Sequence, residues 1–266
     1  MAHYVHYLPR KVVEPDYADR SAQWFAENQP DDQGFEVPSY HVTRSTSGPA
    51  TRVAIGDTIW LFSQLVTPWG SFPAALDAKI SVCDVIPYHR ADEQPARTFR
   101  YQAGQGSRWF PLRDATACIK QLHTRSLSGI VRPILSHPSQ PIGQALQSMR
   151  ELEDADPLLA WAEELSTAAF DLISYRLIDG TPRACKKAME LVHDRQAIFW
   201  DRWSLPRRLA ERREFLSDAA LDAHIMGEIH RCRKVWGIHS ARYAEVDSYS
   251  AREMAEARRL NKLQLY

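Results

Sequence analysis

The stretch "AFDLISYRLIDGTPRACKKAMELVHDRQAIFWD", residues 169 to 201, decides how the second half of the chain folds. Its two ends, 169–176 and 196–201, are short apolar runs that contain the isoleucine and aromatic residues favoured in strands. Between them, residues 181–194 carry Pro182 near the first turn and place small or apolar residues on one helical face. The stretch therefore predicts a strand, a helix and a second strand.

The same alternation continues along the chain. Residues 217–232 predict an amphipathic helix with Ser217 at its N-cap, residues 234–240 predict a third strand, and a last helix begins around Ser250. Strands that alternate with helices form parallel, doubly wound sheets, whose ligand crevice lies at the carboxyl ends of the strands. The residues expected at that crevice are Arg176, Asp201 and Ser240.

The first half has a different pattern, with frequent prolines and short β-like runs. Strands are predicted over 51–65, 75–88 and 96–104, and a single short helix over 111–122. Because no helical repeat of about a dozen residues separates these strands, an antiparallel sheet or a small barrel is expected. The chain therefore divides into a β-rich α+β domain (1–145), a helical linker (146–165) and an α/β domain (166–266).

Composition excludes several classes of protein. The 33 basic and 33 acidic residues balance, so no global field favours nucleic acid or an anionic membrane. Residues 1–20 lack the apolar core of a signal peptide, and no apolar run approaches the roughly 20 residues of a membrane span. We expect a cytoplasmic protein without a metal site. Its cysteines, which form no CxxC pair and are expected to be reduced thiols, are Cys83, Cys118, Cys185 and Cys232.

Three segments of the second half match, in order, the motifs of one domain family. They are "ISYR" (173–176) with Asp179 three residues on, "IFWD" (198–201) followed by "RWSLPRR", and "GIHSARYAEVDSYSAREM" (237–254). Together they resemble the Toll/interleukin-1 receptor (TIR) domain, and in particular its bacterial enzymes, over residues 166–266. The resemblance implies a flavodoxin-like parallel sheet.

The end of the last segment carries the implied catalytic residue. Ser248, Tyr249, Ser250 and Glu253 occupy the family's Ser-Trp-Cys-x-x-Glu motif, with Tyr for Trp and Ser for Cys. The resemblance implies that Glu253 cleaves NAD⁺ as a substrate, with no bound cofactor, in bacterial antiphage defence. It also implies a homo-oligomer formed through the 201–215 loop. The substrate-binding residues that it implies are Tyr175, Arg176, Asp179, Trp203, Ser240 and Tyr249.

A single glutamate is chemically sufficient for this reaction. Cleavage of the bond between nicotinamide and ribose passes through an oxocarbenium-like state, as glycoside hydrolysis does. Nicotinamide leaves as a neutral molecule from a cationic linkage, so no general acid is needed. One carboxylate beside the ribose can hold its hydroxyls and stabilise the developing positive charge.

Several residues have a second interpretation. Tyr249 and Trp203 either stack on the nicotinamide or adenine ring or pack in the core, and Arg176 and Asp179 either meet a nucleotide or pair with each other. The arginine-rich 202–213 segment meets a diphosphate or an acidic partner, or is a solvated loop. At the level of the protein, the alternatives are a non-catalytic TIR adaptor that acts by homotypic assembly and an enzyme similar to the nucleoside deoxyribosyltransferases.

One short segment of the first half resembles a second fold family. "GDTIWLFSQL" (56–65) is similar to a strand of PUA-like and EVE domains, small barrels that bind modified bases or nucleotides. In such a barrel, Arg108 and Trp109 would stack on the base. Alternatively, Trp109 packs in the core. We expect a protein or nucleotide trigger here. TIR domains continue past the last helix, so we expect a reduced, three-stranded sheet, or a first half that covers its exposed edge.

Overall fold

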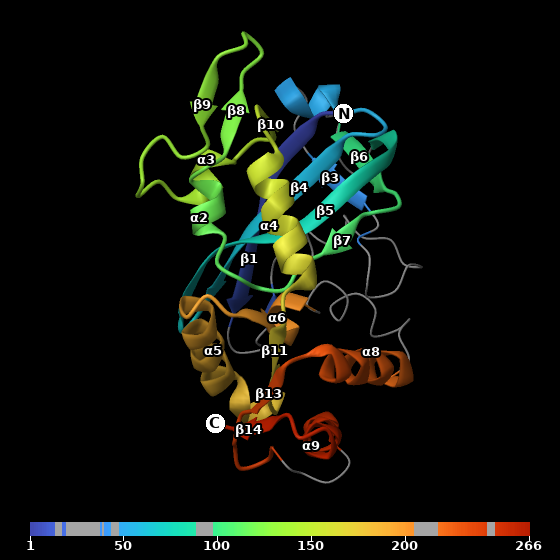
Figure 1. The fold of residues 1–266 in the computed structure, drawn as a ribbon, viewed down its shortest axis with the longest axis vertical. Helices are drawn as coiled ribbons and strands as arrows, with labels where there is room; N and C mark the ends of the chain where they lie inside the picture. Colours follow the sequence, from blue (N-terminus) through green and yellow to red (C-terminus); the bar gives the residue numbers. More distant parts are fainter. Residues whose placement is uncertain are drawn as a thin grey trace.

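The described residues form two β-sheets, a large mixed sheet in the first half and a smaller parallel sheet in the second (Figure 1). The fold is therefore mixed α/β. The computed structural model describes residues 1–13, 18–19, 38, 40–43, 48–88, 98–204, 218–243 and 248–266.

The large sheet has the strand order β3-β6-β5-β4-β1-β10-β8-β9, with β2 beside β1 and β7 beside β5. Its strands are β1 (His3–Val13), β2 (Ala18–Asp19), β3 (Tyr40–Thr43), β4 (Thr58–Thr67), β5 (Gly70–Tyr88), β6 (Thr98–Ala103), β7 (Arg108–Trp109), β8 (His123–Arg125), β9 (Val131–Pro133) and β10 (Arg150–Leu152). The predicted strands correspond to β4, β5 and β6. The expectation of a purely antiparallel sheet was wrong, because β1 runs parallel to β4 over nine paired residues.

Short helices cover this sheet. They are the 3₁₀ helix η1 (Gly48–Arg52) and the α-helices α2 (Thr116–Ile119), α3 (Ile142–Ala145) and α4 (Asp156–Thr167). Leu158, Ala162 and Leu165 of α4 pack into one core with Trp60 and Phe62 of β4. The segment expected to be a helical linker, 146–165, differs from that expectation, because β10 within it pairs with β1 and β8.

The second half alternates strands and helices as its sequence predicts. Its elements are β11 (Phe170–Ser174), α5 (Leu177–His193), β12 (Ala197–Phe199), α6 (Asp201–Ser204), α8 (Asp218–Arg231), β13 (Lys234–Gly237), α9 (Tyr249–Arg259) and β14 (Leu263–Leu265). The sheet is parallel throughout, in the order β12-β11-β13-β14. The expected sheet of three strands is therefore corrected to four, because the chain turns after α9 and pairs β14 with β13.

The two halves share one hydrophobic core. Leu65, Phe72 and Ala75 of the large sheet pack in the same cluster as apolar residues of α5, β11 and β12. Leu112 pairs with Ile198 as an isolated antiparallel bridge, in which each backbone N–H donates to the other residue's carbonyl oxygen at 3.0 and 2.9 Å. This bridge lies on β12, the end strand opposite β14, so the first half contacts the other edge of the sheet from the one that the second alternative concerned.

A buried arginine also joins the halves. Arg10 of β1 is 1% exposed, and its Nη2 donates to the carbonyl oxygens of Arg202 and Trp203 in α6 at 2.8 and 2.7 Å. The guanidinium lies 4.3 Å from the centre of the Trp203 ring and 3.7 Å from Asp77. The backbone of α6 is thus held by the first sheet.

We predict that a fragment of residues 146–266 aggregates. Without Leu65, Phe72, Ala75 and Leu112, the face of α5 and β12 that they cover would meet water. Burial of each large apolar side chain contributes about 1.5 to 3 kcal/mol, and an uncovered strand edge invites pairing between chains. Circular dichroism and size-exclusion chromatography would test this, and a folded, monodisperse fragment would contradict it.

Candidate active site

Glu253 lies on the first half of α9, close to the carboxyl end of β11. The helix begins after Ser248, whose Oγ accepts a hydrogen bond from Ala251 N at 3.1 Å, as an N-cap serine does. Ser250 Oγ donates to the carbonyl oxygen of Tyr243 at 2.7 Å and so ties the helix to the segment after β13. These two serines fix the turn from which the Glu253 side chain points inward, where it is 9% exposed.

The carboxyl group of Glu253 ends a short chain of hydrogen bonds. Ser174, the last residue of β11, donates from its Oγ to Glu253 Oε2 at 2.5 Å. Tyr243 donates from its hydroxyl to Ser174 Oγ at 3.0 Å. Gly237 leaves room for this arrangement, because a Cβ atom there would lie 2.6 Å from the Tyr243 hydroxyl oxygen.

Burial dominates the ionisation of this carboxyl. It raises the pKa of Glu253 from 4.5 to about 7, because water no longer solvates the charged form. The Ser174 hydrogen bond and Arg252 lower this pKa, whereas the charges of Asp201 and Asp222 raise it further. A titratable group displaced to neutral pH by burial and by like charges, beside a pocket, is characteristic of functional sites.

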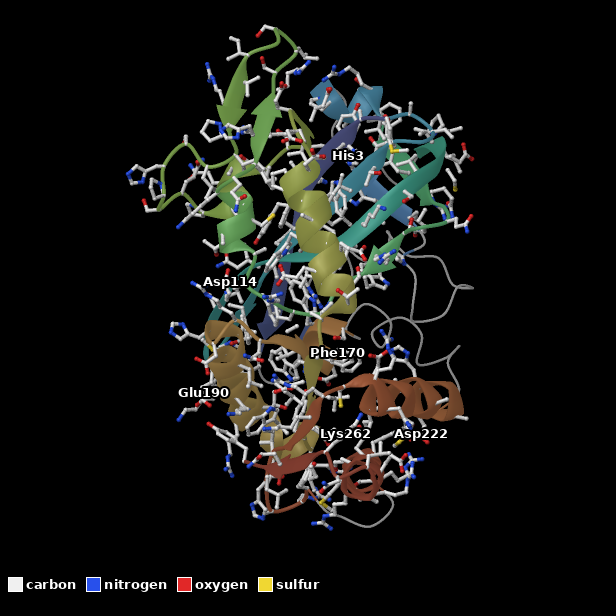
Figure 2. The ribbon with its side chains drawn as sticks, viewed as in Figure 1. His3, Asp114, Phe170, Glu190, Asp222 and Lys262 are labelled. Atoms are coloured by element: carbon white, nitrogen blue, oxygen red, sulfur yellow. The ribbon has the colours of Figure 1, made fainter. Side chains whose placement is uncertain are left out.

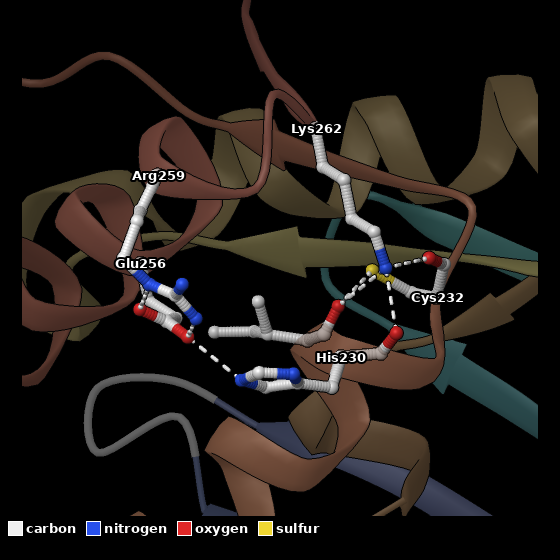
Figure 3. A network of polar contacts seen from close by, with 6 residues as sticks. His230, Cys232, Glu256, Arg259 and Lys262 are labelled. Atoms are coloured by element: carbon white, nitrogen blue, oxygen red, sulfur yellow. Dashed lines mark hydrogen bonds and ion pairs between the residues drawn. The ribbon is translucent and has the colours of Figure 1, made fainter.

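Glu256, three residues on along the same helix, shows the opposite behaviour. It accepts hydrogen bonds from Arg259 Nη2 at 2.6 Å and from Arg259 Nε at 2.7 Å, and it lies 2.7 Å from His230 Nε2 (Figure 3). Arg259, which has the larger effect, and His230 lower the pKa of Glu256 to about 2. The charged form of Glu256 is therefore stabilised by its partners, whereas burial destabilises the charged form of Glu253.

The contacts around Glu256 belong to a clamp between α8 and α9. Lys262, three residues after the end of α9, donates from Nζ to the carbonyl oxygens of Ile229, His230 and Cys232 at 3.1, 2.6 and 2.7 Å (Figure 3). A cation at the last carbonyls of a helix stabilises its C-terminal end. The clamp fixes α8 beside α9, and both helices contribute to the pocket at Glu253.

A pocket of about 190 Å³ opens beside the Glu253 carboxyl. It lies at the carboxyl ends of β11 and β12, where ligands bind in sheets of this kind. Three of the predicted substrate-binding residues, Tyr175, Arg176 and Tyr249, line it together with Glu253. The other lining residues are Leu172, Ile173, Phe199, Asp201, Leu221, Ile225 and Ser250.

Asp201 forms a fixed polar wall of this pocket. The Tyr175 hydroxyl donates to both of its carboxylate oxygens, at 2.8 and 2.9 Å, and Arg202 N donates to Oδ1 at 2.7 Å. Burial, followed by the Asp201 charge, raises the pKa of Tyr175 well above 10. Tyr175 is therefore a neutral donor that orients Asp201, and its ring is available as a wall.

The structure does not bring the remaining predicted residues into this pocket. Asp179 accepts hydrogen bonds from Ser240 Oγ at 2.8 Å and from Arg242 N at 3.0 Å. Asp179 therefore holds the segment after β13, in place of the pair with Arg176 that was its alternative interpretation. Ser240 lines a neighbouring cavity with Arg242, Tyr243 and Arg258.

Trp203 is in the core between the halves. Its side chain is 1% exposed, and its Nε1 donates to the carbonyl oxygen of Phe110 at 3.0 Å. The packing interpretation of Trp203 therefore holds, and the ring is no platform for a ligand at Glu253. Of the predicted 201–215 loop, residues 205–215 lie outside the described part of the chain.

Four residues that shape the site were not predicted as site residues. They are Ser174, Phe199, Tyr243 and Ser250. Ser174 and Tyr243 lie within the quoted motifs, so their place in the family pattern was the available signal. Phe199 also lies within the quoted "IFWD", but an aromatic residue in a strand is normally core, so its residue type did not indicate a site.

Comparisons with protein-family models, with curated proteins and with solved structures give no match for this chain. The described residues include no group of three or more His, Cys, Asp or Glu side chains placed to hold a metal ion. Within the same residues, no helix is long and apolar enough to cross a membrane. What the site can do follows from its own geometry.

We predict that Glu253→Gln stabilises the protein at alkaline pH. The folded-state pKa lies above the unfolded value, so between 4.5 and about 7 the folded chain keeps a proton that the unfolded chain loses. Stability therefore falls as pH rises through this window. At pH 8 the variant should gain up to about 3 kcal/mol, the free energy that such a shift represents.

The gain in the free energy of unfolding should vanish near pH 4, where the Glu253 carboxyl is protonated in both the folded and the unfolded chain. Urea unfolding at the two pH values measures the difference. Glu256→Gln, on the same helix but with its pKa already lowered, is the matched control and should show no gain at pH 8. Equal stability of wild type and Glu253→Gln at pH 8 would show that the carboxyl is not desolvated.

Proposed function

We propose that the protein is an NAD⁺ glycohydrolase in which Glu253 is the catalytic residue. The observation that carries this proposal is the buried carboxyl of Glu253, beside Asp201 and at the mouth of a pocket with two tyrosine walls. A buried carboxyl flanked by further acidic groups destabilises a fold, so a role in chemistry accounts for it better than a role in packing. The strand order β12-β11-β13-β14 supports the flavodoxin-like, TIR-type arrangement that the motifs imply.

The pocket suits the cationic half of the substrate. Its 190 Å³ is less than the roughly 300 Å³ at which pockets for whole ligands begin, so it would take the nicotinamide and its ribose and leave the adenosine outside. The positively charged ring would favour the ionised form of Glu253 as it binds. Asp201 adds a second negative charge on the same side.

The chemical step then needs little from the protein beyond this charge. As the bond to nicotinamide lengthens, positive charge develops on the ribose, and the Glu253 carboxylate stabilises it in a site of low dielectric. The Ser174 hydroxyl orients the carboxylate through its hydrogen bond. Nicotinamide leaves as a neutral molecule, and water then adds to the ribose carbon and loses a proton to give ADP-ribose.

Assembly and a role in antiphage defence remain parts of the proposal. The 201–215 loop begins at α6, immediately beside the pocket wall formed by Asp201, so a neighbouring subunit at this loop would exclude water from the site. Specific activity that rises with protein concentration would support this, and full activity of a monomer would oppose it.

We predict that Glu253→Gln lowers kcat/KM for NAD⁺ by at least about a hundredfold, the effect of removing one electrostatic stabiliser. For the wild type, kcat/KM should rise with pH and level off above about 7, because it reports the pKa of Glu253 in the free enzyme. Nicotinamide release, followed by chromatography between pH 5 and 9, measures both.

Glu256→Gln is again the control and should retain wild-type activity. Undiminished turnover by Glu253→Gln would exclude the assignment. A wild-type protein that assembles but releases no nicotinamide would support the alternative of a non-catalytic TIR adaptor. Exchange of bases between nucleosides would support the alternative of an enzyme similar to the nucleoside deoxyribosyltransferases.

A further inference from the structure

A cavity larger than the Glu253 pocket lies between the two halves of the chain. It has a volume of about 360 Å³ and is lined by β5, β7 and the end of α4 on one side and by β11, β12, α6 and α8 on the other. Phe170, at the start of β11, lies where the two halves meet (Figure 2). Junctions between domains are frequent places for ligand pockets, and this volume is in the range of small-ligand sites.

The walls of this cavity are aromatic. Trp109 comes from β7, Phe170 and Phe199 from neighbouring strands of the parallel sheet, and His224 from α8. The Phe199 ring centre lies 6.4 Å from that of Phe170 and 6.0 Å from that of His224. Such surfaces accept a flat ring by stacking.

Positive charge lies at the rim. The Arg231 side chain is 66% exposed and pairs with Glu228 at 2.8 Å. Arg108 is exposed and, among the described residues, hydrogen-bonds only the neutral hydroxyl of Ser166, at 2.8 Å. Lys79 lies directly opposite Arg108 across strands β5 and β7, and like charges so placed destabilise a sheet. The rim therefore favours an anion.

We propose that this cavity binds a nucleotide of mononucleotide size, with the base between the aromatic walls and the phosphate at Arg108 and Arg231. Guanidinium groups bind phosphate by paired, charge-assisted hydrogen bonds. The site is separate from the Glu253 pocket and does not depend on the reaction proposed there.

Phe199 gives this site a regulatory role. It lines both cavities, so a ring that stacks on it from the junction changes the wall of the Glu253 pocket. This regulatory part, unlike the binding site itself, rests on the proposed NAD⁺ cleavage.

Isothermal titration calorimetry with AMP, GMP, CMP and UMP, and with the corresponding nucleosides, tests the site. At least one monophosphate should saturate the protein, and its nucleoside should bind at least about tenfold more weakly, the effect of losing one charged hydrogen bond. Arg108→Ala and Arg231→Ala should each weaken the monophosphate by about the same factor. Both residues are exposed, and thermal unfolding would verify that the variants fold.

Arg113→Ala is the matched control, because Arg113 is close in sequence but pairs with Glu164 outside the cavity. It should leave the Kd unchanged, as should Glu253→Gln. If none of the four monophosphates saturates the protein, the proposed site is wrong. It is also wrong if neither Arg108→Ala nor Arg231→Ala changes the Kd.

The regulatory part is measured as the rate of NAD⁺ cleavage with and without the saturating monophosphate. A change in rate that is lost in Arg108→Ala supports it. Nucleotide binding with an unchanged cleavage rate would overturn regulation and leave the site intact. If nucleotide binding depends on Arg108 and Arg231 but the protein cleaves no NAD⁺, the proposed function is refuted and the binding site stands.

Discussion

The position of α6 is the constraint on which the rest of the second half depends. Arg10, from the first strand of the chain, donates to two carbonyl oxygens of this short helix, and Phe110 accepts a hydrogen bond from Trp203 within it. Asp201, the first residue of α6, is thereby fixed at the Glu253 pocket. Removal of one partner from a buried ion pair such as Arg10 with Asp77 is strongly destabilising. The β-rich half is thus a structural part of the site.

The second constraint is the burial of a carboxyl group that the fold does not require. Within α9, Glu256 contacts Arg259 and His230, which lower its pKa. Glu253 is buried, and this burial raises its pKa. The enclosing groups come from three parts of the fold, since Ser174 ends β11, Tyr243 lies in the connection after β13 and Asp222 belongs to α8. This convergence on one side chain explains why the clamp between α8 and α9 matters for the site.

Much of this could be predicted from the sequence, because it depends on local patterns. The alternation of strands and helices after residue 169 and the convergence of Tyr175, Arg176, Tyr249 and Glu253 both follow from short motifs. Strand β1 gave no signal, since its buried side chains include His6 and Arg10, which are polar. Strand β14 has three residues, too few for a period to show. The role of Trp203 depends on contacts with Arg10 and Phe110, which are remote in sequence.

The titration of Glu253 in the presence of substrate tests the central claim most directly. Carbon-13 NMR of protein labelled at glutamate, with Glu253→Gln to assign the signal, gives its pKa in the free protein and with a carbocyclic NAD⁺ analogue that cannot be cleaved. We expect about 7 in the free protein and a fall of at least about one unit with the analogue, whose nicotinamide ring is cationic. The reduced analogue, whose dihydronicotinamide ring is uncharged, should not cause this fall. A pKa near 4.5 in the free protein, or the same pKa with both forms, would contradict the account.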